Sequence, residues 1–509
     1  MATRSINNVL VPLAAPAGDG GTYYALFNAL AGSIDVVDQA VLDGLDRLAG
    51  PATPGFVSLG AMRSGSPSTL NDDVLGYLSR RGYLFSSVEE ERDQARMLYE
   101  EMLRFHRATV RQPIVVIPSY NCNLKCPYCW QRLYHLDSPV MSREMVDHLF
   151  SVALPELIET SSPDRVALTV FGGEPLQDEP ELQDRVLQIL TLGRSAGFTN
   201  GIITNGVGLG KALPRLAGKV DVLQVTFDGP ARIHRKRRPL PRGDSFAPLA
   251  GAVSDALAAG IRVRARVNVD ATNLEHLPEL ADFARDQGWL DNPRMYFHIA
   301  PVKNHNPRHD APSETDLLLK VLELADRDER MRAFDLSGFG GIKYFRGFQE
   351  SGLFSLHRFF NCEAQINCWV LDLHGHLYAC WDSAGLPEMA VGRFHPTVEI
   401  DPQALGQWRN RNALDIPACQ QCPAAPHCGG GCQFLAHEHH GRHDAPACDA
   451  LLASYIQAIS RNADWLLERA RLGDHAVGLI TREGVVTAVD RPFGLIDDSP
   501  ELIDAVSCS

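Results

Sequence analysis

Long apolar runs are missing from this 509-residue chain, although apolar residues make up 45% of it. No run approaches the roughly 20 residues that a membrane-spanning helix needs. The first residues, MATRSINNVLVPLAAPAGDGG, contain one Arg, and Pro12 and Pro16 interrupt their short apolar patch, so they make a poor signal peptide. We therefore expect a cytoplasmic protein without a membrane segment.

Positive charge is also scarce. Lys and Arg number 48 against 62 Asp and Glu, which gives a formal net charge of -14. Phosphate backbones and anionic membranes bind basic faces, so this balance argues against nucleic acid or a membrane as a partner. Internal repeats and low-complexity tracts are absent, and a charged content of 22% is typical of a globular protein. At this length we expect two to four domains.

Cysteine is infrequent, with twelve in the whole chain, and this excludes the dense disulfide framework of small secreted domains. Eleven of the twelve nevertheless fall into two groups. Three lie at 122, 126 and 129, eight lie between 362 and 448, and Cys508 stands alone. Grouped cysteines in a reducing compartment indicate metal or redox chemistry.

Six apolar, β-branched segments recur between residues 113 and 302, and helix-like segments fill most of the gaps between them. The six are PIVVIPSYN, RVALTVFGGEP, GFTNGIITNG, DVLQVTFDGP, RVRARVNVD and RMYFHIAPV. This alternation predicts an α/β fold with a parallel sheet and crossover helices, whose chemistry collects at the carboxyl ends of the strands. The first cysteine group, GGEP, TNG and DGP follow the first four segments, so we expect all four at one rim.

The remaining segments flank this pattern. Residues 1–110 mix short strand and helix signals and predict a small α+β domain, which either packs on the rest or docks a partner. Residues 303–361 predict a helical connection. After the second cysteine group, residues 451–509 predict a helix and a tail with two short strands, AVGLIT and GVVTAV.

The first cysteine group, YNCNLKCPYCWQ, has three and then two residues between its thiols. Three thiolates can hold three irons of a 4Fe-4S cluster and leave one iron open. A structural zinc site would need a fourth protein ligand nearby, and the first candidate, His135, follows only after a predicted turn.

These residues resemble the signature of radical S-adenosylmethionine (SAM) enzymes, which carry three cysteines at this spacing and an aromatic residue, here Tyr128, before the last. The resemblance implies a partial (β/α)6 TIM-like barrel over residues 111–302, with SAM on the open iron. GGEP resembles the family segment for the methionine amino group, and TNG and TFDGP resemble later rim segments. Arg266, on the fifth predicted strand, is a candidate partner for the SAM carboxylate. The implied cofactor-binding residues are Tyr128, Gly172, Gly173, Glu174, Asn205, Thr226, Asp228 and Arg266.

The resemblance also implies the reaction. A reduced cluster would pass one electron to SAM, giving methionine and a 5'-deoxyadenosyl radical that abstracts hydrogen from an unactivated C-H bond. The protein would supply the low-potential cluster, the orientation of the reactants and the exclusion of water. An external low-potential donor, a flavodoxin or ferredoxin, is then the expected redox partner.

Eight thiols between 362 and 448 suffice for two closed 4Fe-4S clusters or for two zinc sites. Only one CxxC unit occurs, whereas zinc ribbons usually bring paired units. Gly375 precedes Cys380 with four residues between them, and the run from 419 to 432 has two, five and three intervening residues. This pattern resembles the SPASM extension of radical SAM enzymes over residues 362–450.

The SPASM resemblance implies two auxiliary clusters, and therefore three 4Fe-4S clusters in all. The first auxiliary cluster would take Cys362, Cys368, Cys380 and Cys432, and the second would take Cys419, Cys422, Cys428 and Cys448. With both clusters fully ligated, electron transfer is expected rather than direct coordination of substrate. The CGGGC stretch would allow the tight chain path that crossed ligation needs.

Each of four other features has two interpretations, one functional and one as a side chain or loop without a role. Asp382, two residues after Cys380, is a candidate catalytic base or a solvated side chain. HEHHGRH (437–443) suggests metal binding, and RIHRKRRPLPR (232–242) suggests contact with an acidic peptide. We expect both of these segments to be solvated loops. Cys508 would be a hydrogen donor or a terminal residue without a role.

SPASM-containing relatives mostly modify peptides or proteins, so the sequence predicts a radical enzyme that acts on a ribosomally made precursor peptide. The product would be a crosslink, an epimer or an oxidised side chain. The 1–110 domain would then be a winged-helix-like module that binds a leader peptide by strand addition. One alternative is a sulfatase maturase that makes formylglycine. Another is an iron-sulfur electron carrier or scaffold without turnover, against which GGEP and TNG argue.

Overall fold

The computed structural model describes residues 2–13, 22–48, 70–133, 138–303, 313–352, 354, 359–474 and 476–489. His135 and Cys508, two of the residues considered above, lie outside these ranges. The chain divides into two compact units. Unit 1 combines Met1–His106, Phe339–Asn361 and Arg411–Ser507, and unit 2 holds Arg107–Gly338 and Cys362–Asn410.

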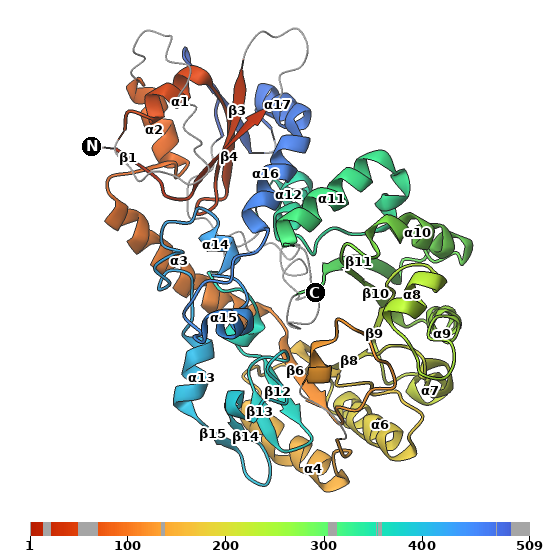
Figure 1. The fold of residues 1–509 in the computed structure, drawn as a ribbon. Coiled ribbons are helices and arrows are strands. Elements are labelled where there is room, and N and C mark those ends of the chain that lie inside the picture. Colours follow the sequence, from red (N-terminus) through yellow and green to blue (C-terminus); the bar gives the residue numbers. More distant parts are fainter. Residues whose placement is uncertain are drawn as a thin grey trace. The chain divides into compact units, whose positions relative to one another are not determined.

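Unit 2 is built on a parallel run of six strands (Figure 1). They are β6 (Gln112–Ile117), β7 (Val166–Val170), β8 (Thr199–Ile203), β9 (Val222–Thr226), β10 (Arg262–Val269) and β11 (Met295–Pro301). Their order in the sheet follows the chain, and every neighbouring pair is parallel. The predicted α/β pattern with a six-stranded parallel sheet is therefore confirmed.

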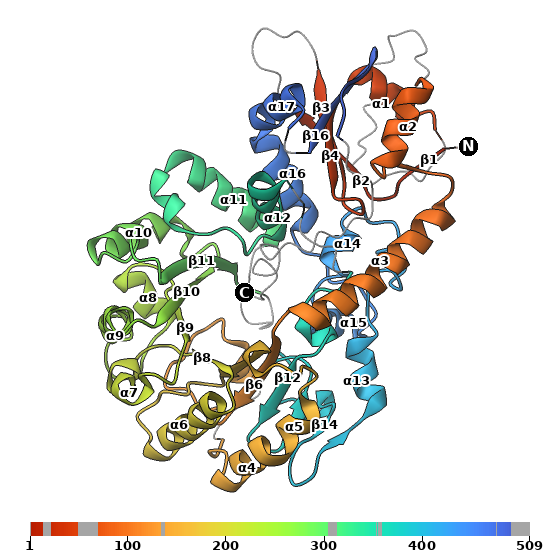
Figure 2. The ribbon, with the colours of Figure 1, turned by 180° about the vertical axis from the view of Figure 1, so that it is seen from behind.

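Helices connect these strands and cover one face of the sheet (Figure 2). They are α4 (Arg143–His148), α5 (Leu154–Leu157), α6 (Pro180–Ser195), α7 (Leu209–Leu216), α8 (Ala231–Arg237), α9 (Ala247–Ala258), α10 (Leu277–Asp286) and, after β11, α11 (Glu314–Arg327). Strand β10 shows the sequence basis of this layering. Val263, Ala265 and Val267 are buried, whereas the alternate residues Arg264 and Arg266 are only half-buried and lie on the opposite face.

Four short strands extend this sheet on the other side of β6. β12 (Trp369–Asp372) lies parallel to β6, and β13 (His376–Tyr378), β14 (Gly392–Arg393) and β15 (Glu399–Ile400) follow as antiparallel neighbours. Gly375 turns the chain between β12 and β13 with a φ of 79°, in the left-handed region that favours glycine. Residues 369–400 therefore continue the sheet of residues 112–301, and α13 (Pro402–Arg409) follows them.

Unit 1 joins strands from near both ends of the sequence in one five-stranded sheet. The strands are β2 (Asn8–Leu13), β3 (Tyr23–Asn28), β4 (Ser33–Asp38), β16 (Val477–Thr481) and β17 (Gly484–Thr487), in the order β17-β16-β4-β3-β2. β16 lies parallel to β4, and the other pairs are antiparallel. The strands predicted from TYYALFNALAGSIDVV, AVGLIT and GVVTAV are confirmed, and the apolar patch that precedes them is strand β2.

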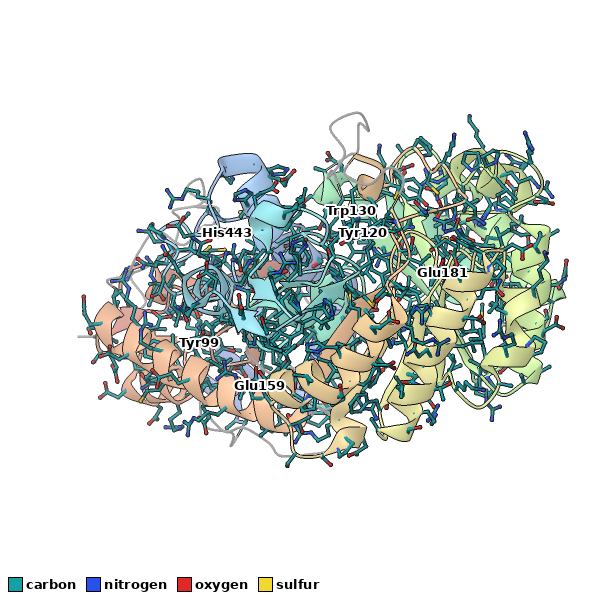
Figure 3. All side chains as sticks on the ribbon, turned by 90° about the horizontal axis from the view of Figure 1, so that it is seen from below. Tyr99, Tyr120, Trp130, Glu159, Glu181 and His443 are labelled. Atoms are coloured by element: carbon teal, nitrogen blue, oxygen red, sulfur yellow. The ribbon has the colours of Figure 1, made fainter. Side chains whose placement is uncertain are left out.

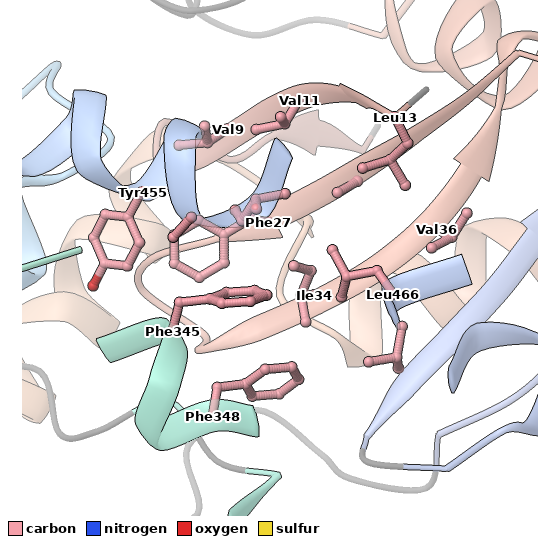
Figure 4. Packing of buried hydrophobic residues seen from close by; sticks show 14 of the residues in the cluster. Val9, Val11, Leu13, Phe27, Ile34, Val36, Phe345, Phe348, Tyr455 and Leu466 are labelled. Carbon is pink, nitrogen blue, oxygen red and sulfur yellow. The ribbon is translucent and has the colours of Figure 1, made fainter. Parts of the chain in front are cut away.

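One face of the unit 1 sheet packs on α12 (Gly340–Ser351), α16 (Leu451–Arg461) and α17 (Ala463–Leu472). Figure 4 shows Phe27 and Ile34 of the sheet beside Phe345 and Phe348 of α12 and Leu466 of α17. Burying each such side chain contributes about 1.5–3 kcal/mol. This core is therefore shared between the start, the middle and the end of the chain.

The other elements of unit 1 are short, apart from one long helix. They are β1 (Thr3–Arg4), α1 (Gln39–Leu45), α2 (Asp72–Arg80), β5 (Leu84–Phe85), the 22-residue α3 (Val88–Thr109), α14 (Ala425–Cys428) and α15 (Gln433–His440). β1 and β5 pair with each other as a separate two-stranded sheet. Helices α1 and α2 pack against the other face of the five-stranded sheet.

Asp35 is a buried carboxylate in the middle strand of this sheet. It accepts hydrogen bonds from the Tyr77 hydroxyl at 3.0 Å, from Arg81 Nε at 2.9 Å, from the Tyr83 hydroxyl at 2.6 Å and from the backbone amide of Gly478 at 2.7 Å. A buried charge is tolerated when its lone pairs have partners in this way. Asp35 thus connects β4, the segment before β5 and strand β16.

The predicted domain segments and the two units divide the chain differently. Residues 1–110 share their sheet with β16 and β17, so their independent folding stays a prediction. None of the helices in the described ranges is long and apolar enough to cross a membrane.

Candidate functional site

The first cysteine group lies on the irregular segment after β6, at the carboxyl end of the parallel sheet. Cys126 is buried, Cys129 is half-buried, and the Cys122 residue is exposed. Burial of the thiols still raises the pKa of Cys122 to about 12 and that of Cys126 to about 11, and the charges of the other cysteines add to both shifts. The three thiols therefore lie near one another, and they need a bound cation to become thiolates at neutral pH.

Gly172 and Gly173, which follow β7, bring the GGEP loop against the cysteine segment. The amide of Gly173 donates to the Ser119 carbonyl at 3.2 Å, and the amide of Glu174 donates to the Asn121 carbonyl at 2.8 Å. A Cβ atom on Gly172 would lie 2.3 Å from the Ser119 oxygen, and one on Gly173 would lie 2.2 Å from the Asn121 oxygen. The chain's own packing therefore requires both glycines, independently of the predicted contact with SAM.

Glu174 is buried and joins GGEP to TNG. Its carboxylate accepts hydrogen bonds from the Leu176 amide at 2.8 Å, from the Thr204 hydroxyl at 2.5 Å and from the Asn205 amide at 2.5 Å. Burial raises the pKa of Glu174, and these donors oppose the rise. An ionised carboxylate can accept more than three hydrogen bonds. The predicted contact with the methionine amino group would use the remaining lone pair of Glu174.

Asn205 connects the TNG loop to the cysteine segment. Its side-chain Nδ2 donates to Asn123 Oδ1 at 2.7 Å and lies 4.0 Å from Cys122 Sγ. The loops after β6, β7 and β8 are thus joined by hydrogen bonds into one rim.

Tyr128, Asp228 and Arg238 form a buried polar network beside Cys126. The Tyr128 hydroxyl donates to Asp228 Oδ2 at 2.5 Å and accepts a hydrogen bond from Arg238 Nη1 at 2.8 Å. Arg237 lies 3.4 Å from the Asp228 carboxylate and 5.0 Å from the centre of the Tyr128 ring. The structure therefore brings Tyr128 and Asp228 together, 100 residues apart in sequence.

Thr226 and Arg266 are lateral neighbours across β9 and β10. Arg266 Nε donates to Asn268 Oδ1 at 2.8 Å. Burial lowers the pKa of Arg266, and the negative charge of Asp382 opposes that shift, which places Asp382 within electrostatic reach of Arg266. Asp382 is half-buried, and its catalytic role stays a prediction.

The rim lies within residues 116–284, which match the family model described as the radical SAM superfamily. These residues form a radical SAM domain. A curated relative, pre-heme d1 synthase of Dinoroseobacter shibae, is 26% identical over 199 residues, which are 36% of this chain and 43% of that protein. The match thus spans less than half of that relative's length.

Solved structures resemble a larger part of the chain. Native anSMEcpe with bound AdoMet is 17% identical and covers 70% of this chain and 98% of its own, with a TM-score of 0.52. Streptococcus suis SuiB bound to S-adenosylmethionine is 13% identical and covers 88% of this chain and 99% of its own, with a TM-score of 0.48. At 17% identity the likeness to anSMEcpe concerns the fold.

The radical SAM domain implies a 4Fe-4S cluster and SAM, and the residues at its rim fit both. In the described ranges no three His, Cys, Asp or Glu side chains meet closely enough to hold a single metal ion. Asp228 Oδ1 and Arg238 Nε are buried without a hydrogen-bond partner in the same ranges. Such atoms are the kind that a polar cofactor satisfies.

Three of the predicted auxiliary ligands lie in unit 2, namely Cys362, Cys368 and Cys380. The β12–β13 ladder pairs Val370 with Tyr378, and continuing this register by two residues, past the ends of both strands, sets Cys368 opposite Cys380. Both of these thiols are buried, and Cys362 is half-buried. Cys432, the predicted fourth ligand of this set, belongs to unit 1.

Asp372 connects this hairpin to the first cysteine segment. It is fully buried and accepts hydrogen bonds from the Tyr120 hydroxyl at 3.1 Å and from the Tyr378 hydroxyl at 3.4 Å. Tyr120 precedes Cys122 by two residues, and Tyr378 precedes Cys380 by two. Figure 3 labels Tyr120 and Trp130, which flank the first cysteine group in the sequence. The radical SAM domain and the β12–β13 hairpin therefore share a buried polar link.

The second predicted auxiliary set lies wholly in unit 1, at Cys419, Cys422, Cys428 and Cys448. Burial raises the pKa of the Cys419 thiol to about 11, and the neighbouring Cys422 and Cys448 add to the rise. Burial also raises the pKa of Cys428, to which Asp449, Cys422 and Cys419 contribute. The structure thus brings these four thiols near one another.

Arg411, which the sequence interpretation missed, organises the CGGGC turn beside this set. Its buried guanidinium donates five hydrogen bonds of 2.6 to 3.2 Å to backbone carbonyls. The acceptors are Gly429, Gly430, Gly431, His443 and Ala445. All three glycines have positive φ, and a Cβ atom on Gly431 would lie 1.7 Å from the Ala447 oxygen. An arginine shortly before a CxxC unit was the available signal, but it specifies no partner by itself.

The expectation of a solvated loop at residues 232–242 is wrong. Most of helix α8 lies there, and His234, Arg237 and Arg238 are buried. Arg237 forms an ion pair with Asp270 at 2.7 Å, and Arg238 reaches the Tyr128 hydroxyl. Burial of these arginines depends on acceptors from distant segments, which the local sequence does not reveal.

The histidine-rich segment is only partly as expected. His439 and His440 are exposed, but they belong to the last turn of α15 rather than to a loop. His437 and His443 are half-buried, and their rings stack with centres 4.7 Å apart. Stacked rings pack on each other, so this contact explains the pair without a metal.

Proposed function

We propose that this chain is a radical SAM enzyme that abstracts hydrogen from a peptide and so modifies it after translation. The observation that carries the proposal is the interlocked rim of unit 2. There the cysteine segment, GGEP and TNG follow three neighbouring parallel strands and are fastened together through Glu174 and the backbone of Gly173. An electron carrier or scaffold needs the cysteines but not this rim.

In this proposal the three cysteines of the radical SAM domain hold a 4Fe-4S cluster, and the rim residues hold SAM. When bound and reduced by one electron, SAM supplies a 5'-deoxyadenosyl radical. Tyr128, Arg237 and Arg238 keep the Asp228 carboxylate fixed beside Cys126. Burial of this network helps to exclude water from the place where a radical is formed.

We further propose that residues 362–450 are a SPASM region with two auxiliary 4Fe-4S clusters, which brings the total to three. The opposed Cys368 and Cys380 support the first auxiliary cluster, and the grouped thiols of unit 1 support the second. These clusters would take up the electron that remains on the substrate after hydrogen abstraction. A flavodoxin or ferredoxin in the cytoplasm would supply the electron for SAM.

A peptide substrate is supported by a fold neighbour and by a surface feature of unit 1. The anSMEcpe structure that holds AdoMet together with the Cp18Cys peptide has a TM-score of 0.50 against this chain. In unit 1, a hollow of 390 Å³ lies between β5 and α3, lined by Ala2, Ser79, Leu84, Phe85, Ser86, Glu90 and Gln94. In the described part of the chain β5 pairs with β1 in a two-stranded sheet, and Leu84 and Phe85 of β5 line the hollow. A leader peptide would bind there as an added strand.

The second candidate is a sulfatase-type maturase that oxidises a cysteine or serine side chain to formylglycine. This second candidate is supported by the Cp18Cys peptide that the same fold neighbour holds. In this version Asp382 would be the base that takes a proton from the oxidised side chain.

Metal analysis and co-expression test the central proposal. The anaerobically reconstituted protein should contain about twelve irons, four for each cluster, and should release 5'-deoxyadenosine from SAM under dithionite. Mass spectrometry of short precursor peptides encoded beside the gene, and of a co-expressed sulfatase, should then identify the product. Stoichiometric zinc, or about four irons with all cysteines intact, would remove the SPASM assignment.

A charge placed in the hollow tests the leader site. The double variant Ser79→Arg and Ser86→Arg should weaken binding of a precursor peptide at least tenfold, measured by fluorescence anisotropy, and should leave SAM cleavage unchanged. Met97→Arg is the matched control, because Met97 is 62% exposed on α3 and does not line the hollow. Equal peptide binding by the double variant and the control would contradict a leader site here.

A further inference from the structure

A row of polar side chains on β10 and β11 contains Arg266 and three residues to which the proposed function gives no role. Arg266 pairs laterally with His298, and Arg264 pairs with Tyr296. Lateral neighbours in a sheet project to the same face, and so do residues two apart on one strand. These four side chains, which we call the arginine row, therefore share the face opposite the buried Val263 and its apolar neighbours.

His298 is the most enclosed member of the row. It is 2% exposed, and neither of its ring nitrogens has a hydrogen-bond partner in the described part of the chain. Burial and the charges of Arg266 and Arg264 lower its pKa to about 3, with Asp335 opposing, so the ring is neutral at pH 7. A neutral imidazole offers one donor and one acceptor, and buried polar groups are rarely left without partners. His298 is thus prepared for a polar ligand.

Among the described residues the two arginines also lack a close counter-ion. Neither Arg264 nor Arg266 forms an ion pair within the described ranges, and Arg266 donates only to the neutral Asn268 side chain. The carboxylates that face the row act at longer range. Asp335 is held by the Tyr296 hydroxyl, and Asp382 opposes the lowered pKa of Arg266. Two guanidinium groups side by side repel each other, and a bound anion relieves this repulsion.

Exposure changes along the row. Tyr296 is 40% exposed, whereas His298, two residues later on the same strand, is almost fully enclosed. Among the described strands β11 is the last of the sheet on this side, and its outer edge is bridged by the backbone of Asp335 at His298. A ligand that enters from solvent therefore meets Arg264 and Tyr296 first and reaches Arg266 and His298 at the enclosed end.

We propose that the arginine row binds a carboxylate of the substrate, supplied by an Asp or Glu side chain or by a chain terminus. Guanidinium groups bind carboxylates through paired hydrogen bonds, and the neutral His298 ring adds an N-H donor. The inference rests on the proposed function, because it takes the substrate to be a peptide. SAM itself is the other source of a carboxylate, but it brings one such group to a row with two arginines.

Calorimetry on the reconstituted enzyme, with SAM at saturation, tests this inference. The probes are N-acetyl-L-aspartic acid amide and its uncharged counterpart N-acetyl-L-asparagine amide. We expect the aspartate probe to bind at least tenfold more tightly. Arg264→Met and His298→Leu should each weaken its binding at least fivefold while changing the Kd of SAM less than twofold. Arg294→Met, which removes an exposed charge just before β11, should change neither.

Three results would overturn the inference. Equal affinity for the two probes, or no binding of either, would mean that the row does not recognise a carboxylate. Loss of SAM affinity in proportion to probe affinity would assign the row to the cofactor instead. Arg264→Lys and His298→Gln guard against misfolding, because they keep the charge or one donor and should bind the aspartate probe better than Arg264→Met and His298→Leu. Since the measurement needs no turnover, it stays informative even if no peptide product is found.

Discussion

The cysteines at 122–129 and those at 419–432 are held in different ways. The first group is fixed from a distance, because Glu174, Thr204 and Asn205 come from loops after two other strands. The second group is fixed largely by its own neighbourhood. Arg411 precedes Cys419 by eight residues and gathers the carbonyls of the glycine turn that follows.

Because of this difference, we expect substitutions to disrupt the two sites in different ways. The rim in unit 2 exists only when three parallel strands are aligned, so a fault in any of its loops reaches the other loops. The glycine turn in unit 1 depends on one guanidinium, so a single substitution can disorganise it while the rim stays intact.

The largest expected effect comes from the thiols themselves. Changing Cys122, Cys126 and Cys129 together to Ala should abolish release of 5'-deoxyadenosine, since SAM then has no iron to bind. Changing Cys419 and Cys422 to Ala should instead reduce peptide product more than SAM cleavage. Chromatography of both products checks this, and a triple variant that still releases 5'-deoxyadenosine under dithionite would contradict the assignment.

Arg411→Met should separate the two sites next most clearly. It removes five hydrogen bonds from a buried cation and leaves the carbonyls without partners, which should lower the free energy of unfolding by about 3 kcal/mol. We expect a loss of about four irons with SAM cleavage retained. Arg442→Met is the control, because its ion pair with Asp444 is exposed and contributes at most ~1 kcal/mol. Equal iron contents in the two variants would show that Arg411 is not what holds the turn.

Alanine at matched glycines sharpens the contrast further. Gly431→Ala drives a Cβ atom onto a carbonyl, whereas Gly441→Ala has open space and only the strain of its positive φ. Urea unfolding should show Gly431→Ala less stable than Gly441→Ala by at least ~1 kcal/mol.

Gly173→Ala, with two carbonyl oxygens 2.2 Å from its Cβ, should damage the rim instead and lower SAM affinity. If Gly173→Ala affected only the irons of unit 1, the two sites would not be as separate as described.

Thr204→Val tests the side-chain link within the rim. It removes one donor to Glu174 without changing the shape of the side chain, so the pKa of Glu174 should rise further and the unfolding free energy should fall by about 1 kcal/mol. Thr199→Val is the control, because Thr199 is half-buried at the start of β8, the strand that Thr204 directly follows. A SAM titration should show weaker binding for Thr204→Val than for Thr199→Val.

The smallest effect concerns acid stability, to which a histidine with a lowered pKa contributes in each unit, His298 in unit 2 and His443 in unit 1. Burial lowers the pKa of His298 to about 3 and that of His443 to about 4, so the unfolded chain binds a proton at higher pH than the folded chain does. The stability that each neutral ring contributes is therefore lost as the pH falls below about 6.5, down to its folded pKa. Urea unfolding from pH 7 to pH 4 should show a shallower fall for His298→Gln than for the unchanged protein, and a smaller difference for His443→Gln.

The parallel sheet was predictable because each strand carries its own signal. Apolar, β-branched runs recur at regular spacing, and GGEP, TNG and DGP follow them directly. Placing those turns at one edge of the parallel sheet brings Glu174 close to Asn205, and Tyr128 close to Asp228.

Other features were unpredictable because their cause lies far away in the sequence. Arg237 and Arg238 look like surface charges until Asp270 and Tyr128 supply partners. Strand β12 offers four residues and pairs with β6, 255 residues before it, which no local pattern indicates. Arg411 looks like an ordinary cation until the glycine turn folds around it.

The five-stranded sheet of unit 1 sets an order for folding during translation. Asp35 leaves the ribosome 443 residues before Gly478, its partner on β16, so the β4 edge waits almost the whole length of synthesis for its neighbour. In that interval the strands of unit 2, which pair in chain order, can assemble first. A nascent chain that stops before residue 477 presents β4 as an unpaired apolar edge, which is a template for aggregation and a natural target for chaperones. Quality control of this protein therefore depends on its last described strands as much as on its cysteines.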